Sequence, residues 1–426
     1  MAVLARGGAL PIGAVFTILT SRTIAEHYGA TAFAFFALLT SFVGLLAFSD
    51  LGLGAAVANA AAEAEAREEL RTAFLITIRR VFRYLLLSMS LILCAVCLIS
   101  LSGAWGALLG EFKTFEGGAL AAAWSLAIFG ASIPLGMGQR ILVGFHKTWM
   151  FSLVGALTPP LAFFGVTVIA ATGGPPSVLP IAFYLAYALT SGLSLWLALR
   201  VSGATVRDIS NAVSADSVKV WNTAAPMAVI VVAAPIAMQS DRVILGHLSP
   251  TGVAGYSLAA QLFSPIGSMI SVAGLALWPV FARRRVSSIS LRGESPLKAS
   301  AFFSLVAAAC AGVAIALTPV YAEFASAGAI EIPLVTAVAF GLLVVVQAFN
   351  APIGTYLTDG PGLKAQAMMV SIGLIVKLAG SLTLAGLPGG AGPVLASTGA
   401  VLMCQVVPGW WLVRRREATE AAAVCR

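Results

Sequence analysis

The chain has 426 residues, of which 59% are hydrophobic and only 10% are charged. Because about a quarter of the residues in soluble domains are charged, this composition excludes an ordinary soluble protein. The formal net charge of +8 is not gathered in a basic run interleaved with aromatic residues on a polar module. It therefore indicates membrane topology and contact with anionic lipid rather than nucleic-acid binding.

Apolar runs of about twenty residues predict membrane-spanning helices. Lipid cannot satisfy backbone polar groups, so a spanning chain is either helical or a closed barrel, and the strict alternation of barrel strands is missing here. The sequence predicts an all-α polytopic membrane protein with about twelve spans, near residues 8–28, 31–58, 84–104, 118–138, 149–171, 179–199, 222–246, 252–280, 299–318, 332–357, 365–386 and 393–413.

The first two spans carry the first candidate residues. Only Arg6 precedes the first apolar stretch, which continues to Arg22 as a membrane span would, so we expect a retained helix rather than a cleaved signal peptide. Asp50 lies late in the second span, beside glycines that allow close packing or a local break. It is a candidate proton or sodium site, with a structural ion pair as the alternative.

The next connection and the third span offer no catalytic or metal site. Residues 71–83 mix four arginines with apolar residues, which predicts an interfacial elbow on anionic lipid. Cys94 and Cys97 form a C-x-x-C in an apolar run, where thiolates are disfavoured.

The three histidines are too far apart in sequence for metal-ligand spacing. We therefore expect neither a metal nor a catalytic residue.

The longest polar connection, residues 202–220, divides the predicted spans into six and six. It predicts an N-terminal lobe at 1–201, a cytoplasmic linker at 202–220 and a C-terminal lobe at 221–426 with a short basic tail. Because six is even, both lobes enter the membrane in the same orientation, as in a parallel internal repeat.

A repeat with a step of 220 residues supports this division. It aligns Arg22 and His27 with Arg242 and His247, and the same step adds the identities Ile24 with Ile244, Thr31 with Thr251, Ala34 with Ala254 and Leu38 with Leu258. The two histidines are expected to form hydrogen bonds near the membrane interface. Chains built of two like halves usually bind their substrate between them.

Arg22 and Arg242 are candidate substrate-binding residues. Both are expected about one and a half turns inside the outer ends of their helices, where an arginine either extends to the interface or faces a cleft. In a cleft, their planar guanidinium groups would bind phosphate oxygens. Asp241 directly precedes Arg242, but successive helix residues point about 100° apart, so the two need not pair. Asp241 is the second candidate proton or sodium site, again with an ion pair as the alternative.

Lys377 lies near the middle of a predicted span, within Gly373-Leu-Ile-Val-Lys-Leu-Ala-Gly380. Such a charge costs about 2.5–3.5 kcal/mol on insertion scales, so it must face protein or water rather than lipid. We expect Lys377 to line the translocation path and bind substrate.

The basic residues predict which side of the membrane each connection occupies. The even-numbered connections and the two chain ends hold 21 of the 25 Lys and Arg residues, leaving Arg22, Lys113, Arg242 and Lys377. Since Lys and Arg gather on the cytoplasmic side, both termini are expected to be cytoplasmic.

Several short motifs are spread along the chain: Tyr28-Gly-Ala-Thr-Ala-Phe33, Ser49-Asp-Leu-Gly-Leu-Gly54, Ser240-Asp-Arg-Val-Ile-Leu-Gly246, Val253-Ala-Gly-Tyr-Ser257 and Leu277-Trp-Pro279. Together they resemble bacterial polysaccharide flippases of the Wzx type. The superfamily also contains multidrug extruders and the lipid II flippase, which has additional helices.

The resemblance implies two six-helix lobes that move an undecaprenyl-pyrophosphate-linked oligosaccharide to the outer leaflet of a bacterial inner membrane. Arg22, Arg242 and Lys377 would then meet pyrophosphate or acidic sugars. Expected partners are this lipid-linked glycan, membrane lipid, and glycosyltransferases or a polysaccharide polymerase, without nucleic acid. No cofactor is expected, and H⁺ or Na⁺ coupling stays open.

Two other functional classes are weighed against the flippase. A cation-coupled multidrug extruder of the same superfamily should prefer acidic residues in its cavity, whereas Arg and Lys dominate the candidate sites here. A membrane polysaccharide polymerase or acyltransferase needs an external catalytic loop, and the predicted outer loops are short. We therefore expect a transporter and not an enzyme.

Overall fold

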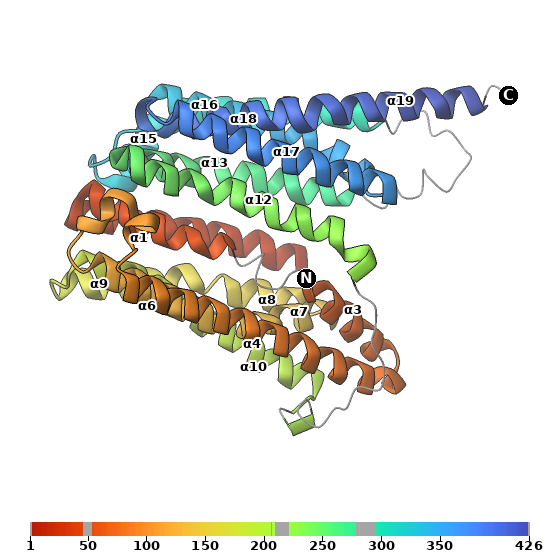
Figure 1. The fold of residues 1–426 in the computed structure, drawn as a ribbon, viewed down its shortest axis with the longest axis horizontal. Coiled ribbons are helices and arrows are strands. Elements are labelled where there is room, and N and C mark those ends of the chain that lie inside the picture. Colours follow the sequence, from red (N-terminus) through yellow and green to blue (C-terminus); the bar gives the residue numbers. More distant parts are fainter. Residues whose placement is uncertain are drawn as a thin grey trace. The chain divides into compact units, whose positions relative to one another are not determined.

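The computed structural model describes residues 2–45, 53–205, 207–208, 221–277, 281 and 295–424. All regular secondary structure in these residues is helical, as the apolar runs predict (Figure 1). Nine helical stretches among them are long and apolar enough to cross a membrane. The protein is therefore a helical, multi-pass membrane protein, while the count of twelve spans stays a prediction.

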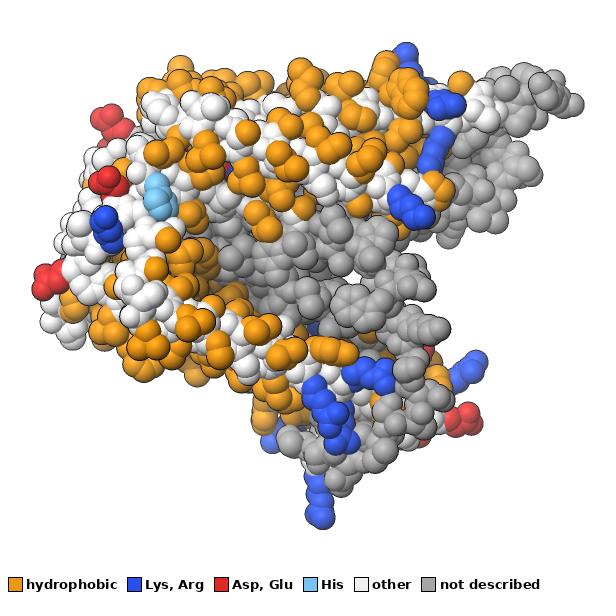
Figure 2. Space-filling model, in the orientation of Figure 1, with side chains coloured by type: hydrophobic (Ala, Val, Ile, Leu, Met, Phe, Trp, Pro, Cys, Tyr) orange, Lys and Arg blue, Asp and Glu red, His pale blue; other side chains and the backbone are white. Residues whose placement is uncertain are grey.

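The surface of the helices is that of a protein in lipid. Hydrophobic side chains cover the long flanks of the helices in Figure 2, whereas Lys and Arg side chains gather toward helix ends. On a single helix, Leu91, Leu98 and Leu101 are 63%, 66% and 84% exposed. Leucines this exposed are disfavoured in water but are at home against hydrocarbon.

The helices divide into two compact units, residues 1–224 with 325–329 and residues 225–324 with 330–426. This is the two-lobed architecture expected from the sequence. The first unit contains α1 (Ala2–Ser41), α3 (Leu53–Ala66), α4 (Arg71–Ser102), α5 (Gly106–Leu109), α6 (Gly118–Ser132), α7 (Met137–Gly144), α8 (Thr148–Gly155), α9 (Thr158–Ala171) and α10 (Leu179–Ser202).

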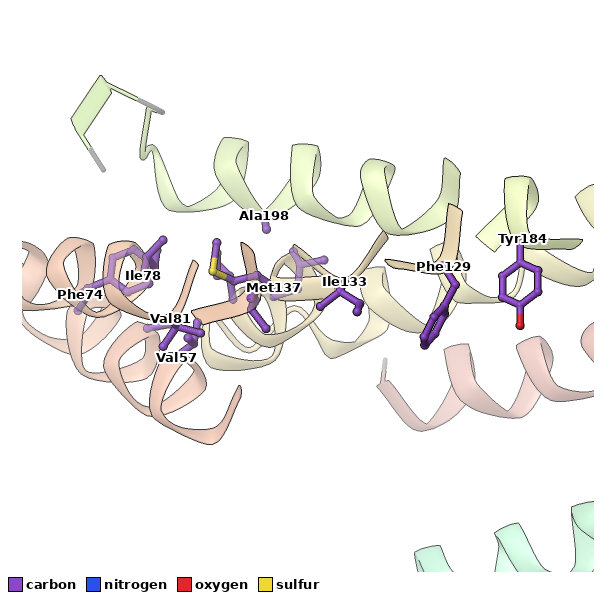
Figure 3. Close-up of a cluster of buried hydrophobic side chains, with 14 residues drawn as sticks. Val57, Phe74, Ile78, Val81, Phe129, Ile133, Met137, Tyr184 and Ala198 are labelled. Carbon is purple, nitrogen blue, oxygen red and sulfur yellow. The ribbon is translucent and has the colours of Figure 1, made fainter. Parts of the chain in front are cut away.

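The core of the first unit lies between α3, α4, α6, α7 and α10 (Figure 3). α4 contributes Phe74, Ile78, Val81 and Leu85, a buried stripe at the spacing of one helix face. These residues lie in the first turns of α4, the helix that also contains most of the third predicted span, 84–104. The interfacial elbow predicted at 71–83 is therefore wrong as a separate element, because its apolar residues pack into the core as the first turns of α4.

The second unit contains the helices that position the candidate site. They are α12 (Trp221–Leu248), α13 (Pro250–Ala276), α15 (Pro296–Ser326), α16 (Leu334–Tyr356), α17 (Gly360–Leu384), α18 (Ala391–Val401) and α19 (Val407–Val424). A π-helical turn, Leu402–Val406, joins α18 to α19. Within this unit α16 packs against α13 and α18, and α17 packs along α18.

The first helix pair of each unit bends at the same place in the repeat. α1 is kinked at Gly29, whose φ of 80° is a conformation that glycine tolerates far better than other residues. A step of 220 residues carries Gly29 to Ser249, which separates α12 from α13. His27 and His247 also make the same contact, from Nδ1 to the carbonyl oxygen four residues earlier, at 3.0 and 2.8 Å. These shared features support the duplication read from the sequence.

Candidate functional site

A buried ion pair lies within the second unit. The Lys377 ammonium on α17 contacts the Asp241 carboxylate on α12, and their side chains are only 3% and 4% exposed. The sequence places the lysine inside a span. Because a charged side chain in hydrocarbon costs free energy, this position predicts that the lysine faces protein or water rather than lipid. The structure shows that it faces protein and that its counter-ion is Asp241.

Lys377 uses its three N–H donors on three oxygens of one helix. It donates to the Ala237 carbonyl, to Ser240 Oγ at 2.6 Å and to Asp241 Oδ1. These acceptors stand at positions i, i+3 and i+4 of α12, so they share one face of that helix. An ammonium group has three donors, and all three are therefore satisfied here.

The Asp241 carboxylate also accepts hydrogen bonds from a third helix, α13, and from a second residue of α17. The Tyr256 hydroxyl on α13 donates to Oδ2 at 3.0 Å, and Ser381 Oγ on α17 donates to Oδ1 at 3.4 Å. We call Ala237, Ser240, Asp241, Tyr256, Lys377 and Ser381 the polar cluster. It joins three helices through a charge pair whose hydrogen bonds offset the loss of water around both ions.

Arg242 lies beside the polar cluster but has different partners. Its Nε donates to Ser257 Oγ at 3.1 Å and its Nη1 to Gln239 Oε1 at 3.0 Å. The guanidinium carbon lies 5.5 Å from the centroid of the Tyr256 ring, within the range of a cation–π contact. None of these three contacts involves the Asp241 carboxylate. Successive residues on a helix point about 100° apart, so Asp241 and Arg242 need not pair. Its planar group is held by two neutral partners.

Arg22 lies on α1 in the first unit and has an acidic neighbour. Its Nε lies 3.7 Å from Glu26 Oε2, and the two side chains are 38% and 53% exposed. An ion pair this exposed contributes less than about 1 kcal/mol to stability. Arg22 and Arg242 therefore occupy equivalent places in the repeat, and both are half-buried, but they contact different kinds of side chain.

The repeat itself explains why the polar cluster is confined to the second unit. The step of 220 residues matches Asp241 with Ser21 and Tyr256 with Phe36. Ser21 is buried and donates to the Thr17 carbonyl at 3.0 Å, so it is satisfied within its own helix. The acid and the phenol hydroxyl that would bind a lysine are thus both replaced in the first unit.

The sequence singled out Asp241, Arg242 and Lys377 separately, and the structure brings all three to one region. It missed Tyr256 and Ser381, because a serine or tyrosine inside an apolar helix is common and carries no signal of its partner. One signal for the pair was available in the sequence. Lys377 and Asp241 are the charged residues deepest in their spans, and buried charges of opposite sign tend to pair in a membrane. Asp50 lies outside the described residues.

Solved structures define the class to which this fold belongs. A multidrug resistance MATE family transporter of the MOP superfamily, in an inward-facing conformation, matches with a TM-score of 0.70 at 13% identity, covering 98% of this chain and 99% of that one. The lipid II flippase MurJ, in an inward closed conformation, matches with a TM-score of 0.69 at 13% identity, covering 97% of this chain and 87% of that one. The chain has the fold of MOP-superfamily transporters.

A family model narrows this class. The model described as polysaccharide biosynthesis protein matches residues 2–284, and the chain belongs to that family. Membership confirms the resemblance to Wzx-type flippases noted from the sequence motifs. No curated protein matches the chain.

Proposed function

We propose that this protein is a flippase that moves an undecaprenyl-pyrophosphate-linked oligosaccharide from the cytoplasmic to the outer leaflet of a bacterial inner membrane. The observation that carries the proposal is membership of the polysaccharide biosynthesis family by a chain with a multi-pass transporter fold. Alternating access of the two lobes would expose the binding site first to one leaflet and then to the other.

Arg22 and Arg242 are the residues proposed to bind the pyrophosphate. Each guanidinium offers five donors in a plane that matches phosphate oxygens. The Arg242 hydrogen bonds to Ser257 and Gln239 use two of these donors, and both acceptors are neutral. A doubly charged pyrophosphate would therefore not have to displace a carboxylate from Arg242.

Lys377 has a different place in the proposal. All three of its donors are used within the polar cluster, so binding a phosphate directly would break the pair with Asp241. The cost of leaving a buried carboxylate unpaired is about 3–5 kcal/mol. Lys377 is thus the weakest of the three candidates as a direct substrate ligand.

The same cluster disfavours a cation-coupled drug extruder. A cationic drug needs an acidic residue that is free to attract it. Asp241 is the acid of the polar cluster, and the Lys377 ammonium already neutralises it. The flippase is therefore the better proposal for a site in which positive charge prevails.

The test of the proposal is transport by the purified protein. Reconstituted vesicles would be loaded with a fluorescent polyprenyl-pyrophosphate oligosaccharide, and its movement between leaflets followed with an impermeant quencher. The double variant R22A/R242A should flip the substrate at least about tenfold more slowly, since each lost phosphate contact removes about 1.5–3 kcal/mol. Lys298→Ala, an exposed lysine at the start of α15, is the control. Normal flipping by the double variant would remove both arginines from the mechanism, and no flipping by the wild type would reject the function.

A further inference from the structure

The polar cluster has the composition of a monovalent cation site. A carbonyl oxygen, a hydroxyl oxygen and a carboxylate oxygen, from Ala237, Ser240 and Asp241, converge on one positively charged atom. Carboxylate and carbonyl oxygens of this kind are what hard cations such as Na⁺ bind in membrane proteins. In this protein the charge at their centre is Nζ of Lys377.

The charge balance of the cluster fits one positive charge and no more. Asp241 is its single acid, and the groups that complete the carboxylate's hydrogen bonds, Tyr256 and Ser381, are neutral. Arg242 follows directly in the chain but is held by Ser257 and Gln239 instead. Both charged side chains are almost fully shielded from solvent, so the carboxylate needs a partner at all times.

We propose that the Lys377 ammonium is a tethered cation, which occupies in the second unit the place where a free monovalent cation would otherwise bind Asp241. It follows that this unit takes up neither Na⁺ nor a similar ion at Asp241 in this conformation.

Shortening the tether should convert the cluster into a site for a free cation. In Lys377→Ala the carboxylate, the hydroxyl and the carbonyl lose their shared donor, and the space of the four-carbon side chain becomes available. Na⁺ or methylammonium, which has the same head group as lysine, should then bind and replace the missing charge. Because binding to the folded state stabilises it, these ions should raise the melting temperature of the variant.

The experiment measures thermal unfolding of purified full-length protein in detergent at constant ionic strength. NaCl and methylammonium chloride are each compared with choline chloride, whose cation is too bulky for the cluster. We expect a rise of several degrees for Lys377→Ala in either small cation and no difference for the wild type. Adding Asp241→Asn to Lys377→Ala should abolish the rise.

The matched control is a second cavity made by truncating a buried side chain of α17 to alanine, at a position outside the polar cluster. Met369 is also buried on α17, and Met369→Ala opens space without removing a charge. The melting temperature of Met369→Ala should lie below that of the wild type by the same amount in all three salts. A selective rise in Met369→Ala would mean that small cations stabilise any cavity here and would overturn the proposal.

Two further results would overturn it. One is a folded Lys377→Ala protein whose melting temperature is the same in all three salts. The other is a wild type that Na⁺ stabilises in an Asp241-dependent way. If Lys377→Ala does not accumulate, Lys377→Ser, which adds a hydroxyl oxygen to the vacated space, is solubilised from cells in each salt. Recovery of folded protein in the small cations alone supports the proposal, and equal or no recovery in all salts rejects it.

Discussion

At the scale of single residues, two buried tyrosines use their hydroxyl groups in contrasting ways. Tyr256 donates at 3.0 Å to Asp241, whose carboxyl group pairs with the Lys377 ammonium, whereas Tyr184 donates to the neutral Leu39 carbonyl at 2.6 Å. Both rings also pack against phenylalanines, at centroid distances of 5.1 Å from Phe340 and 6.0 Å from Phe129. Replacing either by phenylalanine keeps that packing and removes only the hydrogen bond.

We expect Tyr256→Phe to cost more than Tyr184→Phe. Hydrogen bonds to charged groups contribute about 1.5–3 kcal/mol, and those between neutral groups about 0.5–1.5 kcal/mol. Thermal unfolding of the two variants in the same detergent measures the difference. Equal melting temperatures would contradict an ionised Asp241, because the charge of the acceptor is what distinguishes the two sites.

At the scale of helices, the close packing of each unit depends on glycines at particular crossings. A Cβ atom at Gly138 on α7 would lie 2.3 Å from the Leu195 backbone on α10. In the second unit, a Cβ atom at Gly392 on α18 would lie 1.7 Å from the Leu384 carbonyl oxygen at the end of α17. Neither neighbour is a flexible side chain, so each crossing requires a residue without a side chain.

The sharpest test compares two glycines two residues apart. Gly138→Ala should destabilise the protein by at least about 1–3 kcal/mol, the usual cost of overpacking, since the added carbon meets backbone atoms. Gly136→Ala is the control, because nothing lies within 4 Å of its Cβ position. Yields of monodisperse protein and melting temperatures report the effect. Similar values for both variants would show that α7 and α10 do not approach each other so closely.

The sequence predicted the presence of the helices but not where α4 begins or which charged residues pair between helices. Long apolar runs predicted the helices, because twenty apolar residues leave lipid as their only favourable surroundings. The position of the α4 start was missed, since Phe74 and Ile78 mark a helix face equally well in an interfacial segment and in a core. The pairing of Lys377 with Asp241 was also missed, because residues 136 apart in sequence are joined only by the packing of α17 on α12.

At the scale of the whole molecule, the distribution of basic residues predicts the orientation in the membrane. α4 separates two exposed acidic residues, Glu69 before its start and Glu116 beyond its end. The positive-inside rule places the connection of Glu69, which is rich in arginine, in the cytoplasm and that of Glu116 outside. These two sites test the orientation without changing any of the basic residues on which the prediction depends.

The measurement is cysteine labelling in a variant whose five natural cysteines are replaced. In intact cells a membrane-impermeant maleimide should label Glu116→Cys and leave Glu69→Cys unlabelled until the membrane is permeabilised. The reverse pattern would invert the topology and put Arg22 and Arg242 near the cytoplasmic side. A pyrophosphate would then meet the arginines on entry from the cytoplasm rather than near the outer leaflet, so the labelling result also decides at which stage of the proposed transport cycle they act.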